Sequence, residues 1–517
     1  MRFYEAIMQP STQKPASAFD SLGLKATVTS LLDEIRELYT ADTVPWVIGY
    51  SGGKDSTACL QLVWLALAGL PLDQRKKTVH VISTDTLVEN PVVAAWVTKS
   101  LDTIRQRADA SAMPIIPHRL TPEVTDTFWV NLIGKGYPAP RPRFRWCTER
   151  LKIKPSNSFI SNVVRESGEV ILVLGIRKAE SQARARSMEK HEARRVRDRL
   201  SPNGKLPNSL VYSPVEDWTN DDVWMFLMQY PNAWGYNNKD LLTMYQGASA
   251  DGECPLVVDS STPSCGDSRF GCWVCTLVEK DKSMQAMIQN DEEKEWMLPL
   301  LKLRDELDVA DDRHLRDFRR MNGLVQIFNK KPIPGPYMQS ARENWLRRVL
   351  ESQSWVRRNG PEHVRDIELI TLAELQEIRR IWVVEKHEVE DSLPRIYQEA
   401  TGEPYPAPPL EESTVLSAED MVLLREACGN DRLRFEMARE LLDVERRHRS
   451  MARRAGLYDA IESAIRRGFF ADEEDATSYA LERQEARQRV EEMRRSRWLP
   501  QTGQPAQLEL VSEAEAQ

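Results

Sequence analysis

The chain has 517 residues, of which 41% are hydrophobic and 29% charged, and its formal net charge is −8. This length predicts more than one domain, and the composition is typical of a soluble globular protein. The acidic balance excludes nucleic-acid binding through overall charge, so any polyanion site must be a local patch. The N-terminus has no apolar signal core, and the longest apolar run (58–70) is too short to span a bilayer. We therefore expect a cytoplasmic protein with no membrane partner.

The first half of the chain alternates apolar strands with helices, after a helical lead-in over residues 1–40. Strands are predicted at 44–50, 78–86, 113–120 and 168–177, and helices at 54–70 and 91–111. Strands that are apolar throughout and separated by helices indicate a parallel sheet covered on both faces. Residues 41–230 are therefore predicted to form a doubly wound α/β domain, whose ligands bind at the carboxyl ends of the strands.

The rest of the chain is predicted to be mainly helical. Residues 231–400 contain a cysteine-bearing loop followed by helices, and residues 401–414 form a proline-rich, acidic linker. Residues 415–499 contain charged amphipathic helices, and residues 500–517 have the composition of a disordered tail. We expect a helical C-terminal extension attached to the α/β domain.

The stretch SGGKDST (51–57) lies between the first strand and the first helix of the α/β domain. A Walker loop is excluded, because Ile48 stands where its first glycine should be and Asp55 where its hydroxyl should be. Two adjacent glycines permit a tight turn, and the amides that open the helix can face an anion. Asp55 can hold Mg²⁺ against phosphates. The predicted ATP-binding residues of the loop are Ser51, Gly52, Gly53, Lys54, Asp55, Ser56 and Thr57.

This loop resembles the pyrophosphate (PP) loop of the ATP pyrophosphatases, which have an adenine nucleotide α-hydrolase-like fold and cleave ATP between its α and β phosphates. LGIRKAESQARA (174–185) and YSPVEDWTNDDVWMFL (212–227) resemble segments of adenylylsulfate and phosphoadenylylsulfate reductases. Arg177 and Arg184 could pair with phosphate oxygens. Asp85 stands where a ribose or metal ligand would, although it could equally cap the next helix; the same alternative holds for Asp222. The predicted catalytic residues are Asp55, Lys54 and Arg177.

Four cysteines, Cys147, Cys265, Cys272 and Cys275, are spaced as metal ligands. Three neighbouring thiols and one distant thiol suit either Zn²⁺ or a 4Fe–4S cluster, and spacing does not choose between them. The role of Cys254 stays open between a structural residue, a replacement ligand and a persulfide carrier. Cys59 and Cys428 are most simply buried small hydrophobic residues. A thiolate near many cations is expected to have a lowered pKa.

A basic stretch surrounds Cys147 and contains aromatic residues, as expected where a polyanion backbone is bound and bases are stacked. The predicted DNA-binding residues are Arg141, Arg143, Arg145, Arg150, Lys152 and Lys154.

Taken together, these segments, with PGPYMQSARENWLRRVLE (334–351), resemble the DndC-type sulfurtransferases of bacterial DNA phosphorothioation systems, and the resemblance covers nearly the whole chain. It implies a 4Fe–4S cluster, sulfur from a cysteine desulfurase, other Dnd proteins as partners, and DNA as substrate. A DNA phosphate oxygen would be adenylated by ATP and then replaced by sulfur. Three alternatives stay open: a tRNA thiolase, an adenylylsulfate-type reductase, whose E-C-G-[IL]-H motif the sequence lacks, and a non-catalytic, zinc-stapled nucleotide sensor.

Overall fold

The structure is a computed structural model that describes residues 16–195, 197–249, 270–408, 416–449, 451 and 453–498. The chain forms two compact units whose segments interleave along the sequence. The first comprises Met1–Ala310, Arg342–Arg379 and Leu393–Pro406, and the second Asp311–Ala341, Arg380–Ser392 and Ala407–Gln517. None of the helices in the described ranges has the length and apolar character needed to cross a membrane.

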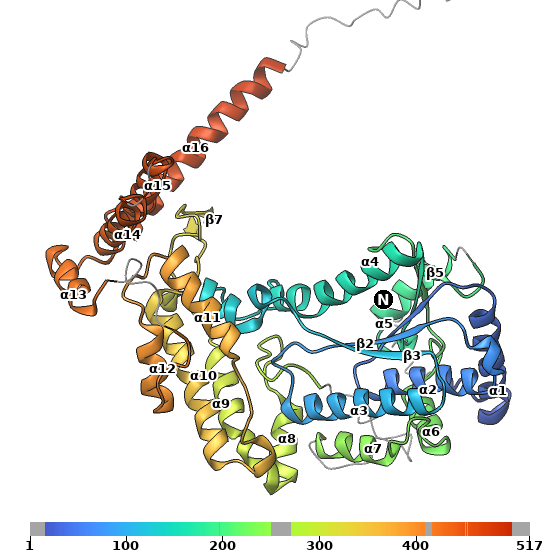
Figure 1. Cartoon of the computed structure of the whole chain (residues 1–517). Coiled ribbons are helices and arrows are strands. Elements are labelled where there is room, and N and C mark those ends of the chain that lie inside the picture. Colours follow the sequence, from blue (N-terminus) through green and yellow to red (C-terminus); the bar gives the residue numbers. More distant parts are fainter. Residues whose placement is uncertain are drawn as a thin grey trace, which may run out of the picture. The chain divides into compact units, whose positions relative to one another are not determined.

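A six-stranded sheet lies at the centre of the first unit, in the order β3-β2-β1-β4-β6-β5 (Figure 1). Neighbouring strands run parallel except for β5 and β6, which are antiparallel. Ile48 of β1 lies opposite Val81 of β2 and Val173 of β4. The strands are β1 Trp46–Gly49, β2 Val79–Thr84, β3 Ile115–Leu120, β4 Val170–Val173, β5 Ser201–Pro202 and β6 Ser209–Tyr212.

Helices cover both faces of this sheet, which confirms the predicted doubly wound α/β fold (Figure 1). On one face, Trp46 and Ile48 join a core built with α1, α2, α3 and α6. On the other face, Val47 packs with Leu172 and with Ile160 of α4. Alternate residues of β1 thus enter different cores, which explains why this strand is apolar throughout. These helices and their neighbours are α1 Gly23–Thr40, α2 Lys54–Ala68, α3 Pro91–Ala110, α4 Lys154–Ser167, α5 Gln182–Glu192, α6 Asn220–Gln229 and α7 Asn238–Gly247.

The predicted strands and helices of this domain are confirmed in type, with shifted ends. The largest shift concerns 168–177, since β4 ends at Val173. The chain passes close to α2 at Gly175, where an added Cβ would lie 2.6 Å from the backbone oxygen of Asp55. The short strands β5 and β6 were not predicted, because they follow a long polar stretch with no apolar alternation.

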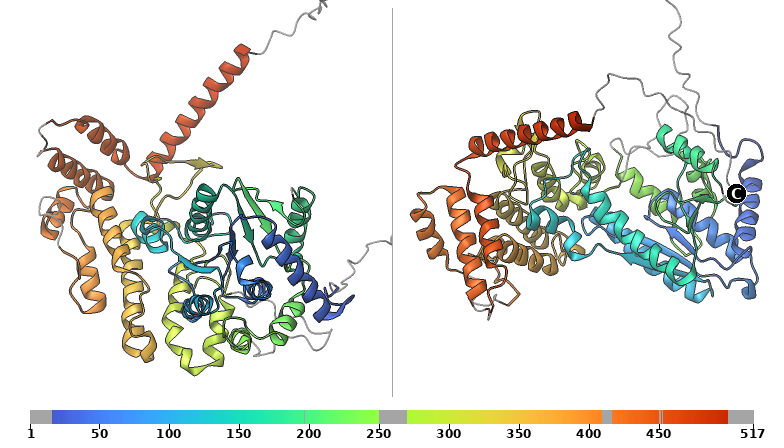
Figure 2. Two further views of the ribbon diagram at one scale, coloured as in Figure 1. Left: turned by 45° about the vertical axis from the view of Figure 1, so that its right-hand side comes forward. Right: turned by 90° about the horizontal axis from the view of Figure 1, so that it is seen from above.

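The remaining elements are mostly helices, as predicted for the C-terminal extension. α14 and α15 of the second unit lie side by side (Figure 2), and Gly468 allows this approach because an added Cβ would meet Met437 at 2.6 Å. These elements are α8 Lys282–Asn290, α9 Leu298–Leu307, β7 Ile327–Phe328, β8 Lys331–Pro332, α10 Gln339–Asn359, α11 Leu372–Arg380, α12 Leu393–Thr401, α13 Ala418–Ala427, α14 Arg432–Arg449, α15 Leu457–Gly468 and α16 Glu473–Trp498.

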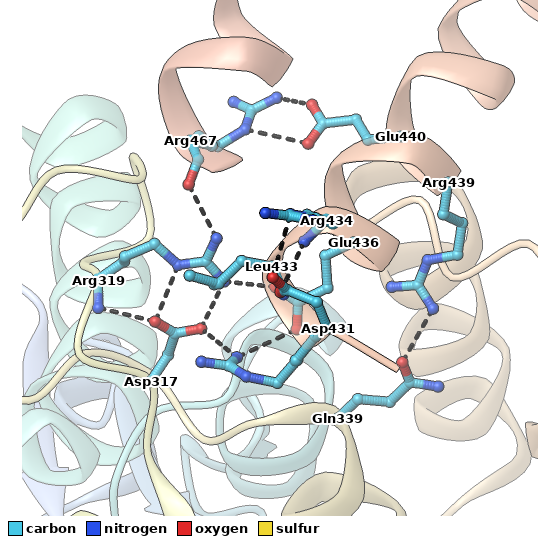
Figure 3. A network of polar contacts seen from close by, with 11 residues as sticks. Asp317, Arg319, Gln339, Asp431, Leu433, Arg434, Glu436, Arg439, Glu440 and Arg467 are labelled. Atoms are coloured by element: carbon cyan, nitrogen blue, oxygen red, sulfur yellow. Dashed lines mark hydrogen bonds and ion pairs between the residues drawn. The ribbon is translucent and has the colours of Figure 1, made fainter. Parts of the chain in front are cut away.

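A polar network ties the second unit together (Figure 3). The Arg319 guanidinium lies 2.7 Å from an oxygen of Asp317 and 2.5 Å from an oxygen of Glu436. Arg432 adds a contact of 2.9 Å to the same Asp317 oxygen. Burial opposes ionisation of Asp317, but the two arginines outweigh burial and lower its pKa to about 2. The network therefore stabilises the unit only while Asp317 is charged.

Candidate active site

The phosphate loop has the tight, close-packed turn that its glycines predict. Gly52 has a φ of +73°, and an added Cβ would lie 2.6 Å from Val97 of α3. The Trp96 indole donates a hydrogen bond of 3.1 Å to the Gly52 carbonyl. A larger residue at position 52 would therefore face both an unfavourable φ and a steric clash, so only glycine fits this turn.

The predicted loop residues divide into two groups. Residues 51–55 line a cleft of about 930 Å³ at the carboxyl ends of the strands. Ser56 instead organises the loop, since its hydroxyl lies 3.1 Å from that of Ser51 and donates to the Gly53 carbonyl at 3.0 Å. Thr57 is buried. The ligand-facing part of the loop is therefore its first five residues and the opening turn of α2.

The Asp55 carboxylate holds the charged residues of the loop together. One oxygen accepts from Arg177 Nε at 2.7 Å, and the other lies 3.1 Å from Lys54 Nζ. The Arg177 side chain is only 5% exposed and also donates to the Trp218 carbonyl at 3.2 Å. Arg177 is thus placed to position Asp55, although it also lines the cleft. Binding of a phosphate by two Arg177 nitrogens, as the sequence suggested, would displace the contact with Asp55 or the contact with Trp218, because Nε and Nη1 are both engaged.

The other predicted nucleotide residues occupy different places. Asp85 lines the cleft and accepts hydrogen bonds from Arg119 Nε at 3.0 Å and from the Leu87 amide at 2.8 Å. Arg184 belongs to α5, is 44% exposed, and lies 3.4 Å from Glu180. Asp222 is buried and caps α6 together with Thr219. For Asp222 the capping alternative is therefore confirmed.

Tyr245 of α7 is a cleft residue that the sequence did not reveal. Its hydroxyl lies 3.4 Å from the Lys54 amide, and its ring lies 5.6 Å below the Lys54 ammonium. The Phe270 ring packs edge-on against it at 4.7 Å, just before the segment that bears Cys272. The Tyr245 hydroxyl thus accepts a hydrogen bond from the Lys54 amide at the start of α2, where a phosphate oxygen is expected to bind.

Cys272 lies beside the carboxyl end of β2. Its backbone pairs with Glu89, its sulfur lies 3.3 Å from the Thr86 hydroxyl, and Lys152 Nζ lies 3.1 Å from Glu89. Burial raises the pKa of the Cys272 thiol to about 12, and the charge of Glu89 adds to this effect. Burial alone would lower the pKa of Lys152, but the Cys272 and Glu89 charges outweigh it and raise that pKa.

The predicted lowering of the thiol pKa is therefore wrong for Cys147 and Cys272. Burial also raises the pKa of Cys147, and the charge of Cys275 raises it further, so these two thiols are electrostatic neighbours. The nearby cations are held by carboxylates, and desolvation dominates. Cys59 is fully buried, as predicted, whereas Cys428 is only partly buried at the end of α13.

The donor chemistry of Cys147, Cys272 and Cys275 suits a metal or cluster, since all three are unbridged thiols. Across the described ranges, however, no group of three or more His, Cys, Asp or Glu side chains is arranged to hold a metal ion. Cys265 and Cys254 lie outside those ranges. The four-cysteine ligand set stays a prediction.

The six predicted DNA-binding residues are not equivalent. Arg150 lies 2.5 Å from an oxygen of the buried Asp126, and Lys154 contacts its other oxygen. Burial opposes ionisation of Asp126, but these two cations outweigh it and lower its pKa. Lys152 pairs with Glu89, and Arg141 donates to the Val309 carbonyl at 2.5 Å. Arg143 and Arg145 are exposed.

The cleft brings the two chemical features of the first unit together. Its lining includes the phosphate loop, Asp85 and Arg177, and also Glu89 and Lys152, which contact or neighbour Cys272. Tyr245, Asp126 and the pairing of Lys152 with Glu89 could not be predicted from the sequence, since each depends on contacts between residues distant along the chain. The cleft can therefore bind a nucleotide next to a thiol-bearing segment.

Comparison with known families agrees with this geometry. Residues 45–233 match the family model described as the phosphoadenosine phosphosulfate reductase domain. The first unit thus carries a nucleotide-binding domain similar to those reductases. An uncharacterized protein of Methanocaldococcus jannaschii, MJ0066, is 28% identical over 195 residues. That match covers 38% of this chain and 34%, about a third, of the relative.

Solved structures give more distant likenesses. A phosphoadenylyl-sulfate reductase from Candida auris is 13% identical, covers 44% of this chain and 93% of its own, and has a TM-score of 0.25. An FMN adenylyltransferase from Candida glabrata is 13% identical, and the match covers 47% of this chain and 65% of the other, with a TM-score of 0.26. The tRNA thiolase NcsA from Methanococcus maripaludis, solved with its 4Fe–4S cluster, is 13% identical. The match covers 56% of this chain and 82% of the other, with a TM-score of 0.27. Such low scores and identities do not distinguish among the activities of these proteins.

Proposed function

We propose that the protein is an ATP-dependent sulfurtransferase that adenylates a DNA backbone phosphate and replaces one of its oxygens with sulfur. The observation that carries this proposal is a cleft lined both by the phosphate loop and by Glu89, which pairs with the Cys272 backbone. A nucleotide site alone would suit many enzymes. Its proximity to the partly buried thiol of Cys272 favours chemistry in which an activated oxygen is displaced by sulfur.

In the first step, a non-bridging oxygen of the DNA phosphate attacks the α-phosphorus of ATP, and pyrophosphate leaves. The amides of residues 52–54 and the Lys54 ammonium would bind the departing phosphates. Asp55, held by Arg177, would bind Mg²⁺ through a carboxylate oxygen. Positive charge at this point offsets the charge that accumulates when two phosphoryl groups meet.

In the second step, sulfide attacks the adenylated DNA phosphorus, the bond from phosphorus to the adenylated oxygen breaks, and AMP leaves with that oxygen. Two electrons from an external thiol would release this sulfide from the persulfide of the sulfur donor. Cys147, Cys265, Cys272 and Cys275 would hold a 4Fe–4S cluster, with Zn²⁺ as the alternative. When bound, such a cluster would supply a site for an incoming sulfur atom. A cysteine desulfurase would donate the sulfur, and other Dnd proteins would be partners. Lys152 would keep positive charge at this end of the cleft.

The proposal is tested by following ATP cleavage with purified, anaerobically prepared protein. We expect the products to be AMP and pyrophosphate rather than ADP and phosphate. Their formation should depend on added DNA. Asp55→Asn should reduce the rate at least 100-fold, since one oxyanion- or metal-binding group is typically worth this much. The matched control Asp73→Asn, an exposed carboxylate outside the cleft, should be unchanged. ADP as product, or a rate independent of DNA, would contradict the proposal. Colourless protein with one zinc would instead support a non-catalytic scaffold.

A further inference from the structure

An exposed turn over residues 141–145, here called the aromatic turn, belongs to the first unit and precedes Cys147 by two residues. Phe144 is 46% exposed at this turn and is flanked by the exposed Arg143 and Arg145. A single exposed phenyl ring is common on protein surfaces and means little alone. Its position between two exposed arginines is what requires an explanation.

Backbone hydrogen bonds close the aromatic turn. Arg141 and Phe144 exchange two backbone hydrogen bonds, of 3.3 Å and 2.8 Å. The Tyr137 ring lies 6.3 Å from the Phe144 ring, and the Trp146 indole donates to the Pro138 carbonyl at 2.9 Å. Phe144 is therefore held in an exposed position by the turn and is not a loosely packed core residue.

The base of the aromatic turn is fixed to the thiol-bearing segment. Thr276 directly follows Cys275, and its hydroxyl donates a buried hydrogen bond of 2.6 Å to the Pro140 carbonyl. Cys147 follows Phe144 by three positions and opens the helical turn at 148–153. A ligand bound at the turn is consequently held close to the thiols.

The charges around the aromatic turn are not equally available. Arg150 and Lys154 neutralise Asp126, and Lys152 pairs with Glu89. Arg143 and Arg145 make no ion pair with any residue in the described part of the chain. An incoming polyanion would therefore be met first by Arg143 and Arg145, on either side of an aromatic face.

We propose that Phe144 stacks on a nucleobase while Arg143 and Arg145 contact the flanking phosphates, so that the substrate strand is unpaired at the modified linkage. A phenyl ring can stack on a base only when one face of that base is free, which a continuous duplex does not offer. The inference rests on the proposed function for its choice of a polynucleotide, and it adds that a single-stranded or locally opened region is bound.

The test is fluorescence anisotropy with a labelled single-stranded DNA of about 12 nucleotides, the same sequence as RNA, a duplex, and a strand with an abasic site. Stacking contributions of this kind correspond to about a 5- to 150-fold change in affinity. Phe144→Ala should weaken single-strand binding by that factor, Phe144→Tyr should restore it, and neither should change duplex binding. The abasic strand should bind wild type about as weakly as the intact strand binds Phe144→Ala. Arg143→Ala should reduce the salt slope by about 0.7.

Phe328→Ala is the matched control, because Phe328 is 67% exposed and lies in the second unit; it should bind as wild type does. The stacking inference would be overturned if Phe144→Ala left single-strand affinity unchanged, or if it lowered duplex affinity by the same factor. Neither result would contradict the proposed function. No binding of either nucleic acid would overturn both. RNA bound more than tenfold better than DNA, and sensitive to Phe144, would support stacking but refute DNA as the substrate.

Discussion

Substituting Gly175 by alanine tests whether the end of β4 positions the phosphate loop. An added Cβ would lie 2.6 Å from the Asp55 carbonyl oxygen, 2.8 Å from its carbon and 3.1 Å from the Ser56 amide. All three are backbone atoms, so no side-chain rotation relieves the contact. The two segments must separate by about 0.4 Å to reach even the 3.0 Å lower limit of real Cβ contacts.

Overpacking of this kind costs about 1–3 kcal/mol. At about 2–4 °C per kcal/mol, the first unit should melt a few degrees to about 10 °C lower. Because the displaced atoms belong to Asp55 and the start of α2, ATP affinity should also fall, by about tenfold or more. Differential scanning fluorimetry and calorimetric titration with ATP measure the two effects.

The matched control is Gly247→Ala at the end of α7, where an added Cβ meets nothing within 4 Å. This variant should be neutral or slightly stabilised, since alanine is favoured over glycine in a helix. If Gly175→Ala had the melting temperature and the ATP affinity of wild type, the close contact at Gly175 would not determine the position of the phosphate loop.

Further predictions concern charge and the cleft. The pKa of Asp317 in the folded protein is about 2, below the ordinary value of 3.8 for an aspartate. Its roughly 2 kcal/mol of stabilisation is therefore present above about pH 4 and lost as pH falls through 2. Amide hydrogen exchange in the second unit should thus be faster in Asp317→Asn than in wild type at pH 7, and the two should exchange alike near pH 2. Tyr245→Phe frees the Lys54 amide, so calorimetry should show ATP bound equally or about twofold tighter; tenfold weaker binding would be incompatible. Asp126→Asn should lower the melting temperature yet leave single-strand affinity within about threefold, and a larger gain would mean that the released Arg150 and Lys154 contact the ligand.

The fold and the phosphate loop could be predicted because their signals are local. The apolar run 44–50 needs burial on both faces, and the order glycine, glycine, lysine, aspartate within seven residues fixes a turn and a helix start. The helix over 91–111 was predicted almost to its ends, since Asn90 caps it and Pro91 begins it.

The pairing of charges could not be predicted, because partners lie far apart in sequence. Arg177 and Asp55 are separated by 122 positions, and only folding shows that the arginine is buried against the carboxylate. Likewise, a count of cations around Cys147 and Cys272 suggested acidic thiols. Their desolvation, and the carboxylates that hold those cations, reverse this conclusion.

Mass spectrometry of nuclease-digested DNA is the most direct test of the central claim, that this chain places sulfur on the DNA backbone. The DNA should come from cells that carry the gene with its native neighbours, as wild type, Asp55→Ala, Cys272→Ser and the control Cys428→Ser, which lies in the second unit. We expect sulfur-containing dinucleotides in wild type and in the control, and none in the other two variants. Dinucleotides that persist in Asp55→Ala and Cys272→Ser, or that are absent from wild type with its partners expressed, would contradict it.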